Sequence, residues 1–321
     1  MRLRLVPKDT KWDFFKTSTL TFGLSALAMI ASIVLFFMMG LNFGIDFKGG
    51  TTIRTDAAIT VDVSAYRDAI TPLGLGDISI TQVHDLAHPD QNVTQIRIEA
   101  QDGDEAVTSA MIARVRDALQ AYEPSIKFAA VESVGPKVSG ELVWTAVEAV
   151  IAAIAAVLFY IWLRFEWQFS VGAVVALVHD VVLTIGVFSL LQIKFDLAII
   201  AALLTIVGYS LNDTVVVFDR VRENLRKFKT LSLRDVLNGS INETLSRTVM
   251  TSVTTLIALV SLYVLGGDVI RGFVFAMIWG VIVGTYSSVF IASAILLRLG
   301  VKRDWSKTDN NAGGQYAHID A

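Results

Sequence analysis

Six long apolar segments constrain this chain more than any other feature of its sequence. The hydrocarbon core of a bilayer is about 30 Å thick, and a helix needs about 20 apolar residues to cross it. Segments of that length lie at 18–40, 143–163, 171–191, 197–218, 248–266 and 273–297. The first exceeds the apolar core of a cleaved signal peptide and is followed by no clear Ala-x-Ala site, so it reads as an uncleaved anchor. The sequence therefore predicts an α-helical polytopic membrane protein with six transmembrane helices.

The distribution of lysine and arginine predicts the orientation of these spans. Basic residues beside a span are retained in the cytoplasm, whereas long domains are translocated largely regardless of charge. On one side of the predicted spans lie 17 Lys and Arg residues, found in 1–17, Arg164, the loop 219–247 and the tail 298–321. The short loops on the other side hold only Lys194 and Arg271. We therefore expect both termini to be cytoplasmic and residues 41–142 to form an extracytoplasmic domain.

The amino-acid composition excludes several classes of function. Hydrophobic residues make up 54% of the chain, more than the roughly 45–50% of an ordinary soluble domain. The net charge of −3 argues against a nucleic-acid partner, which a strongly basic surface would accompany. The chain has no cysteine and four scattered histidines, so thiolate chemistry is excluded and no zinc pattern is present. We expect neither a cofactor nor a metal.

Residues 41–142 have the pattern of a small α+β domain. Alternating or β-branched runs and two helical stretches follow one another at 51–55, 62–71, 78–83, 93–98, 105–121 and 126–132. This is the β-α-β-β-α-β order of a ferredoxin-like fold. His84, Asp85 and His88 lie close together beside a turn. A solvated loop is the favoured interpretation of that cluster, and a metal or acid–base site is the alternative.

Ionisable residues inside the predicted spans are candidates for function, because each costs about 2.5–3.5 kcal/mol on insertion scales. His179 and Asp180 fall near the middle of the third span, and Asp213 lies inside one end of the fourth. Arg247 enters the fifth span from the same side. We expect Asp213 and Arg247 to pair, since pairing lowers the cost of burying either charge. A static ion pair and a proton-binding pair both remain open.

Several segments resemble the SecD/SecF family, which belongs to the RND superfamily of transporters. They are GIDFKGGT at 44–51, VGPKVSGEL at 134–142, and ALVHDVVLT, GYSLNDTVVVFDRVREN, LSRTVMTSVTTLIALVSLYVLGG and GTYSSVFIA in the third to sixth spans. Together they run from about residue 20 to 298 in the family's order. The resemblance implies a SecF-type, RND-like half that pairs with SecD to form SecDF in the bacterial inner membrane. It further implies association with the SecYEG channel and YajC, and use of the proton-motive force to export preproteins.

The resemblance also implies roles for particular residues. A proton pathway is expected to contain Asp213, Arg247, Asn212, Thr214, His179 and Asp180. A glycine-rich signature beside the small domain contains Gly44, Asp46, Phe47, Gly49, Gly50, Gly135 and Pro136. Hinges and ordinary turns are the two interpretations of its glycines. The chain is expected not to be an enzyme; an intramembrane hydrolase built on Asp180 and Asp213 has no matching signature. A non-energised scaffold for the export channel and an exporter half for lipids or small molecules are the competing interpretations of its function.

Overall fold

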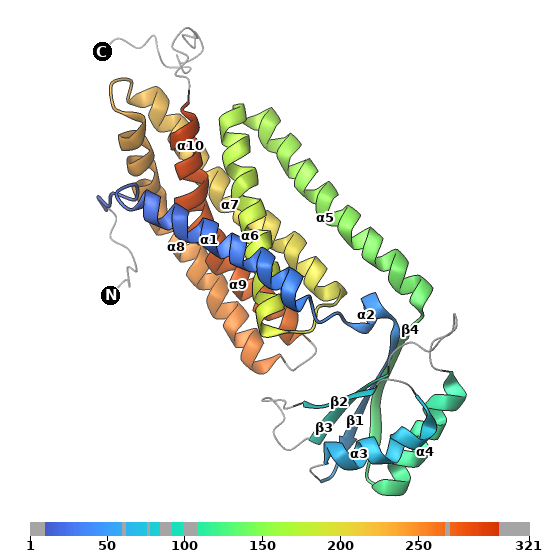
Figure 1. The fold of residues 1–321 in the computed structure, drawn as a ribbon. Coiled ribbons are helices and arrows are strands. Elements are labelled where there is room, and N and C mark those ends of the chain that lie inside the picture. Colours follow the sequence, from blue (N-terminus) through green and yellow to red (C-terminus); the bar gives the residue numbers. More distant parts are fainter. Residues whose placement is uncertain are drawn as a thin grey trace, which may run out of the picture.

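The structure, a computed structural model, describes residues 10–59, 62–75, 78–83, 92–98, 108–266 and 270–301, without the side chains of 136–138. A bundle of long helices carries a small α+β domain at one end (Figure 1). The bundle helices are α1 (Ser18–Met39), α5 (Pro136–Arg164), α6 (Trp167–Leu191), α7 (Leu197–Lys227), α8 (Leu233–Leu265), α9 (Arg271–Ser287) and α10 (Ser293–Leu299). A π-helical turn, Ser288–Ala292, joins α9 to α10. Within these described residues, six helices are long and apolar enough to cross a membrane, as predicted.

The bundle helices differ sharply in how much of their surface is buried. Two-thirds of the most apolar stretch of α9 and α10 is buried, and half of that of α6. The shares fall to 11% in α1 and α8 and to 6% in α5. An apolar helix that is not covered by protein is suited to contact with lipid or with another membrane protein. The core of the bundle therefore consists of α6, α7 and α9.

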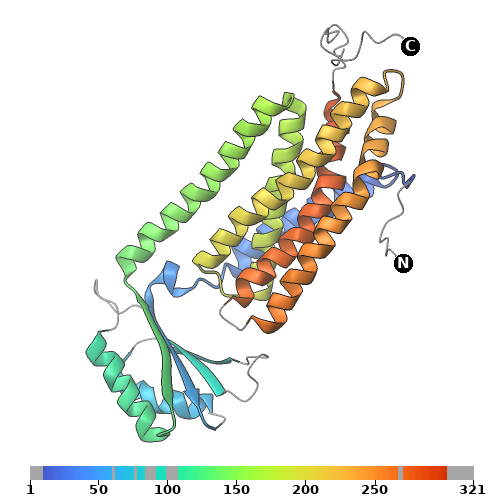
Figure 2. The same ribbon diagram turned by 180° about the vertical axis from the view of Figure 1, so that it is seen from behind.

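Helix α5 is attached mainly at its two ends. Near its start, Ser139 is buried and its hydroxyl donates to the carbonyl of Ile45 at 3.3 Å. Near its end, Ile161 is buried in the main apolar cluster of the bundle. Between these points several large apolar side chains, including Ile151, are exposed. In both views α5 and α8 lie on opposite sides of the bundle (Figures 1 and 2).

The predicted ferredoxin-like pattern of the small domain is confirmed. Its elements are α2 (Ile45–Lys48), β1 (Gly50–Ala57), α3 (Val63–Ile70), β2 (Ile78–Val83), β3 (Asn92–Ile98), α4 (Ser109–Tyr122) and β4 (Lys127–Val134). The strands form an antiparallel sheet in the order β2-β3-β1-β4. Both α3 and α4 cover one face of this sheet (Figure 1), where Ile53, Ile96, Tyr66 and Leu119 are fully buried. The cluster His84, Asp85 and His88 lies outside the described residues.

The predicted loop at 219–247 is wrong, because α7 continues to Lys227 and α8 already begins at Leu233. Apolar residues keep the helical spacing through this segment, and Val221, Leu237 and Ile241 are buried in the bundle core. The basic residues occupy the remaining faces of the same helices, except Lys229, which lies in the connection between them. The second predicted span, 143–163, lies within a longer helix that begins at Pro136, where proline suits the first helical position.

Close packing of α7 against α9 provides a test of the fold. A Cβ atom added at Gly280 of α9 would overlap the side chain of Ile206 of α7. We expect Gly280→Ala to lower the stability of the protein in detergent by about 1–3 kcal/mol, because overpacking forces the two helices apart. Gly208→Ala on α7 is the matched control, since its added Cβ meets no atom within 4 Å. Equal thermal unfolding temperatures for the two variants would contradict this packing.

Candidate functional site

The buried carboxylate of Asp180 lies at the meeting point of three helices. One carboxylate oxygen, Oδ1, is 2.9 Å from Nδ1 of the neighbouring His179 on α6. The other, Oδ2, accepts hydrogen bonds from Ser210 of α7 at 2.6 Å and from Ser287 of α9 at 2.7 Å. Both His179 and Asp180 are 1% exposed. Burying a carboxylate is costly unless its oxygens are hydrogen-bonded. Here α6 carries the carboxylate and His179, and α7 and α9 each supply a serine hydroxyl as donor.

Small residues bring the donors within reach of Asp180. A Cβ added at Gly284 of α9 would lie 3.0 Å from Cβ of Ser210, so glycine permits this close approach of α7 and α9. The sequence predicted that His179 and Asp180 lie near the middle of the third span. It did not identify Ser210 and Ser287 as their partners, because contacts between helices depend on the rotation of each helix about its axis.

His179 connects this site to α1 through a tyrosine. Its Nε2 is buried and has no hydrogen-bond partner among the described residues. The imidazole ring lies 6.1 Å from the ring of Tyr286, centroid to centroid. The Tyr286 hydroxyl lies 2.9 Å from the hydroxyl of Ser25 and donates to the carbonyl of Thr21 at 3.1 Å, both on α1. The polar centre of the bundle thus extends from α9 to α1.

Asp213 lies one turn after Ser210 on α7 but is not part of the Asp180 network. Its side chain is 4% exposed, and its buried Oδ2 has no hydrogen-bond partner in the described part of the chain. The neighbouring Thr214 is also buried and donates to the carbonyl of Ser210 at 3.2 Å. Asp213 is therefore a buried carboxylate with spare capacity to accept a hydrogen bond or a proton.

The expected contact between Asp213 and Arg247 is not formed. Arg247 lies on the exposed face of α8, and its charge acts on Asp213 only through space, without an ion pair between these two described residues. Asn212 is exposed as well, on the adjoining surface of α7. The sequence indicated how deep each residue lies, but the rotation of α8 turns Arg247 outwards. The six predicted residues thus divide into buried His179, Asp180, Asp213 and Thr214, and exposed Asn212 and Arg247.

The glycine signature forms a joint between the small domain and α7. The backbone of Phe43 pairs with that of Phe195, in the connection between α6 and α7. The Gly44 N–H donates to the Phe195 carbonyl at 2.7 Å, and the carboxylate of Asp46 accepts from the Leu197 N–H at 3.1 Å. Asp46 therefore caps the first turn of α7, the helix that carries Asp213. A carboxylate at a helix N-terminus satisfies a free N–H group and complements the helix dipole.

Some positions of the signature require glycine for their backbone conformation, and others do not. Gly49 has φ of 74° and Gly50 has φ of 123°, a region that residues with a Cβ rarely adopt. Gly135 has φ of −73° and precedes the first turn of α5, so its backbone suits other residues too. Pro136 begins α5. Phe47 packs against Phe43, with ring centroids 5.6 Å apart.

Charged groups surround this joint. The guanidinium of Arg97 on β3 donates to the Phe43 carbonyl and ties the sheet to the joint. Asp196, just before α7, lies 3.8 Å from Lys194 in an ion pair. Burial raises the pKa of Asp196 and nearby Asp46 adds to the rise, while Lys194 opposes it. Among the described residues, no group of three His, Asp or Glu side chains is arranged to hold a metal ion.

Comparison with known families and proteins agrees with this architecture. Residues 114–302 match the family described as "Protein export membrane protein SecD/SecF, C-terminal", and residues 34–57 match the "SecD/SecF GG Motif". The second match contains the joint.

Known proteins resemble the chain over nearly its whole length. It is 61% identical to "Protein translocase subunit SecF" of Cereibacter sphaeroides, covering 100% of this chain and 99% of that protein. It is 58% identical to the protein of the same name from Rhodobacter capsulatus, covering 96% and 95%.

A solved structure shares the fold. The crystal structure of SecDF from Thermus, described as a translocon-associated membrane protein, matches with a TM-score of 0.82 and 35% identity. The match covers 93% of this chain and 40% of that one, so the chain spans less than half the length of SecDF. The chain belongs to the SecD/SecF family of protein export membrane proteins, among its SecF subunits.

Proposed function

We propose that this chain is the SecF half of a SecDF complex that assists Sec-dependent export of preproteins across the bacterial inner membrane, driven by the proton-motive force. Asp213 carries the proposal: it is a buried carboxylate, one oxygen of which has no hydrogen-bond partner among the described residues, in a bundle that shares the fold of SecDF. One proton moving down 100 mV releases about 2.3 kcal/mol, enough to shift a two-state equilibrium about 50-fold. Asp213 would bind and release that proton, and Arg247 would bias its release.

The exposed polar surface beside Asp213 supports a membrane partner. Thr205 and Asn212 on α7 and Arg247 and Thr254 on α8 are all exposed. Polar groups facing lipid are costly, so we propose that SecD covers this surface and completes the proton pathway. The SecYEG channel and YajC would bind the resulting SecDF complex, and membrane lipids would surround it. A non-energised scaffold would not require this buried, unpartnered carboxylate next to a polar face.

The proposed topology follows from the basic residues. The α5–α6 turn, the α7–α8 turn and α10 lie at the end of the bundle opposite the small domain (Figure 1). Arg164, Arg220 and Arg298 belong to this end. The positive-inside rule then places this end in the cytoplasm and residues 41–142 outside. The spans keep the limits proposed from sequence, within helices that continue beyond the bilayer.

The joint offers a route from the proton site to the small domain. Asp213 lies sixteen residues after Leu197 on α7, a distance of about 24 Å along the helix axis. A shift of α7 would move Asp46 through the hydrogen bond at its first turn, and Asp46 leads through Gly49 and Gly50 into β1. The two glycines would act as the pivot. The small domain would thereby respond to protonation deep in the bundle and, with the partner's outer domains, hold the emerging preprotein.

Neutralising Asp213 tests the proton role. We expect Asp213→Asn to abolish the stimulation of export by the proton-motive force, because the amide cannot bind and release a proton. The measurement is preprotein export in cells depleted of their own SecF, with membrane levels and SecD co-purification checked. Asp219→Asn is the matched control on α7, since Asp219 is an exposed partner of Arg164 at 3.1 Å and its loss should have little effect. Normal export by Asp213→Asn would leave the chain as a scaffold.

Removing the cap at the joint tests the transmission route. We expect Asp46→Ala to reduce export severalfold while SecD still co-purifies, because α7 loses the contact that links it to β1; loss of a cap costs about 1 kcal/mol. The matched control is Asp68→Ala on the exposed face of α3. Wild-type export rates in Asp46→Ala would show that movement does not pass through this hydrogen bond.

A further inference from the structure

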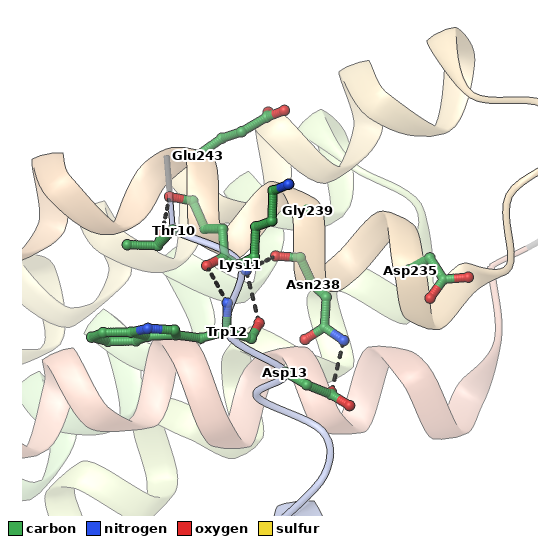
Figure 3. Close-up of a pocket in the computed structure, with 9 residues that line it drawn as sticks. Thr10, Lys11, Trp12, Asp13, Asp235, Asn238, Gly239 and Glu243 are labelled. Carbon is green, nitrogen blue, oxygen red and sulfur yellow. Dashed lines mark hydrogen bonds between the residues drawn. The ribbon is translucent and has the colours of Figure 1, made fainter. Parts of the chain in front are cut away.

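Residues 10–17, termed here the N-terminal strap, lie across the first turns of α8 before the chain enters α1 (Figure 3). Phe14 and Phe15 are 8% and 6% exposed and belong to the same apolar cluster as Ile241 and Leu245 of α8. An open cleft of about 490 Å³ borders the contact. The strap is therefore an integral part of the bundle at the end that we propose to be cytoplasmic.

Two asparagine side chains bind the backbone of the strap. The Asn242 amide accepts from the Trp12 N–H at 3.0 Å and donates to the Trp12 carbonyl at 2.8 Å. One turn earlier, Asn238 accepts from the Phe14 N–H at 3.0 Å. The first pair of bonds satisfies both polar groups of one residue, as a neighbouring β-strand would do. Asparagine is a poor residue for a helix interior, so helix formation alone does not account for two of them here.

The side chain of Asp13 adds further bonds between the strap and α8. Asn238 and Asp13 point toward one another in Figure 3, and the Asn238 amide donates to Asp13 at 2.8 Å. The guanidinium of Arg234 donates to the other carboxylate oxygen of Asp13, also at 2.8 Å. The hydrogen bond from Asn238 lowers the pKa of Asp13, and Arg234 lowers it further. Asp13 thus stays ionised and keeps its partners across the physiological pH range.

The same section of α8 is fastened to α7 on its other side. Glu243 accepts from the guanidinium of Arg220 and, at 2.9 Å, from the amide of Asn224. Asn224 also donates to the Ser240 hydroxyl at 3.1 Å. Arg247 follows Asn242 by five residues, about 7.5 Å along the helix. The contacts with α7 and the strap therefore set the height and rotation of α8 just before Arg247.

We propose that Asn238 and Asn242 are positioning residues for Arg247, which they orient by fastening the start of α8 to the strap and hence to α1. This inference rests on the proposed function, in which Arg247 biases proton release from Asp213. At its far end, α1 is held to α6, because the Ser189 hydroxyl donates to the carbonyls of Leu35 at 3.0 Å and Gly40 at 2.8 Å. The chain then enters the joint. A movement of α8 would consequently reach the joint along α1, in addition to the route through α7.

Substitution of both asparagines tests the proposal. We expect Asn238→Ala with Asn242→Ala to lower the rate of export driven by the proton-motive force about tenfold, with membrane levels and SecD co-purification unchanged. Gly239→Ala is the matched control between them; it is exposed, its added Cβ meets no atom within 4 Å, and export should stay normal. Wild-type export by the double variant would overturn the inference. If Arg247→Ala alone also exported normally, the proposed function would fail with it.

Non-additivity separates positioning from general stability. In an Arg247→Ala background the two asparagine substitutions should cause no further loss, because the group that they position is gone. An additional tenfold loss in that background would assign the asparagines a structural role only and overturn the proposal.

A covalent link between the strap and α8 tests whether restoring their contact restores export. The chain has no cysteine, so Trp12→Cys with Asn242→Cys introduces its only two thiols, at a site where the native residues are hydrogen-bonded. Export by this variant should be impaired when reduced. It should be restored when a short thiol-reactive cross-linker, a bis-methanethiosulfonate, links the strap to α8, each cysteine thiolate displacing one methanesulfinate. Each single cysteine variant treated with the reagent is the control. If cross-linking restores no export, holding the strap to α8 is not what the asparagines do.

Discussion

A carboxylate in the middle of a membrane-spanning bundle is costly to bury unless the helices around it supply hydrogen-bond donors. Asp180 imposes this requirement on α6, α7 and α9, which supply His179, Ser210 and Ser287. The helices that meet at Asp180 are the most buried, whereas α1, α5 and α8 present apolar surface outward. Asp213, one turn after Ser210 on α7, is buried without such donors among the described residues. One bundle thus contains a hydrogen-bonded carboxylate that fixes the packing and a second carboxylate that we propose binds a proton.

Much of the fold could be predicted because its signals are local. Six apolar segments of bilayer length and the β-α-β-β-α-β order of the small domain depend only on residue type and spacing. The predicted loop at 219–247 was wrong for a physical reason: charge marks where a chain leaves the bilayer, not where a helix ends. Val221 and Ile241 continue the buried faces of α7 and α8 beyond that point. The length of a helix therefore does not show where the chain leaves the bilayer.

Less of the candidate site could be predicted from the sequence, because its contacts join residues that are far apart in the chain. Depth along a helix predicted that Asp180 and Asp213 lie within the spans and that Arg247 lies at the start of the fifth. Rotation about the helix axis decides which of them meet, and it turns Arg247 away from Asp213. The bond between Asp46 and Leu197 joins residues 151 positions apart. No local pattern predicts such a contact, although the signature around Gly49 and Gly50 marked the segment in which it occurs.

The sparse attachment of α5 gives it the properties of a lever. Its 29 residues form a rod about 43 Å long, held by Ile161 at one end and by Ser139 beside the joint at the other. A tilt of about 10° at the Ile161 end would displace the far end of such a rod by about 8 Å. Rearrangements near the α5–α6 turn that are small on the scale of a side chain would thus be magnified into displacements of the sheet larger than the distance of about 4.8 Å between neighbouring strands.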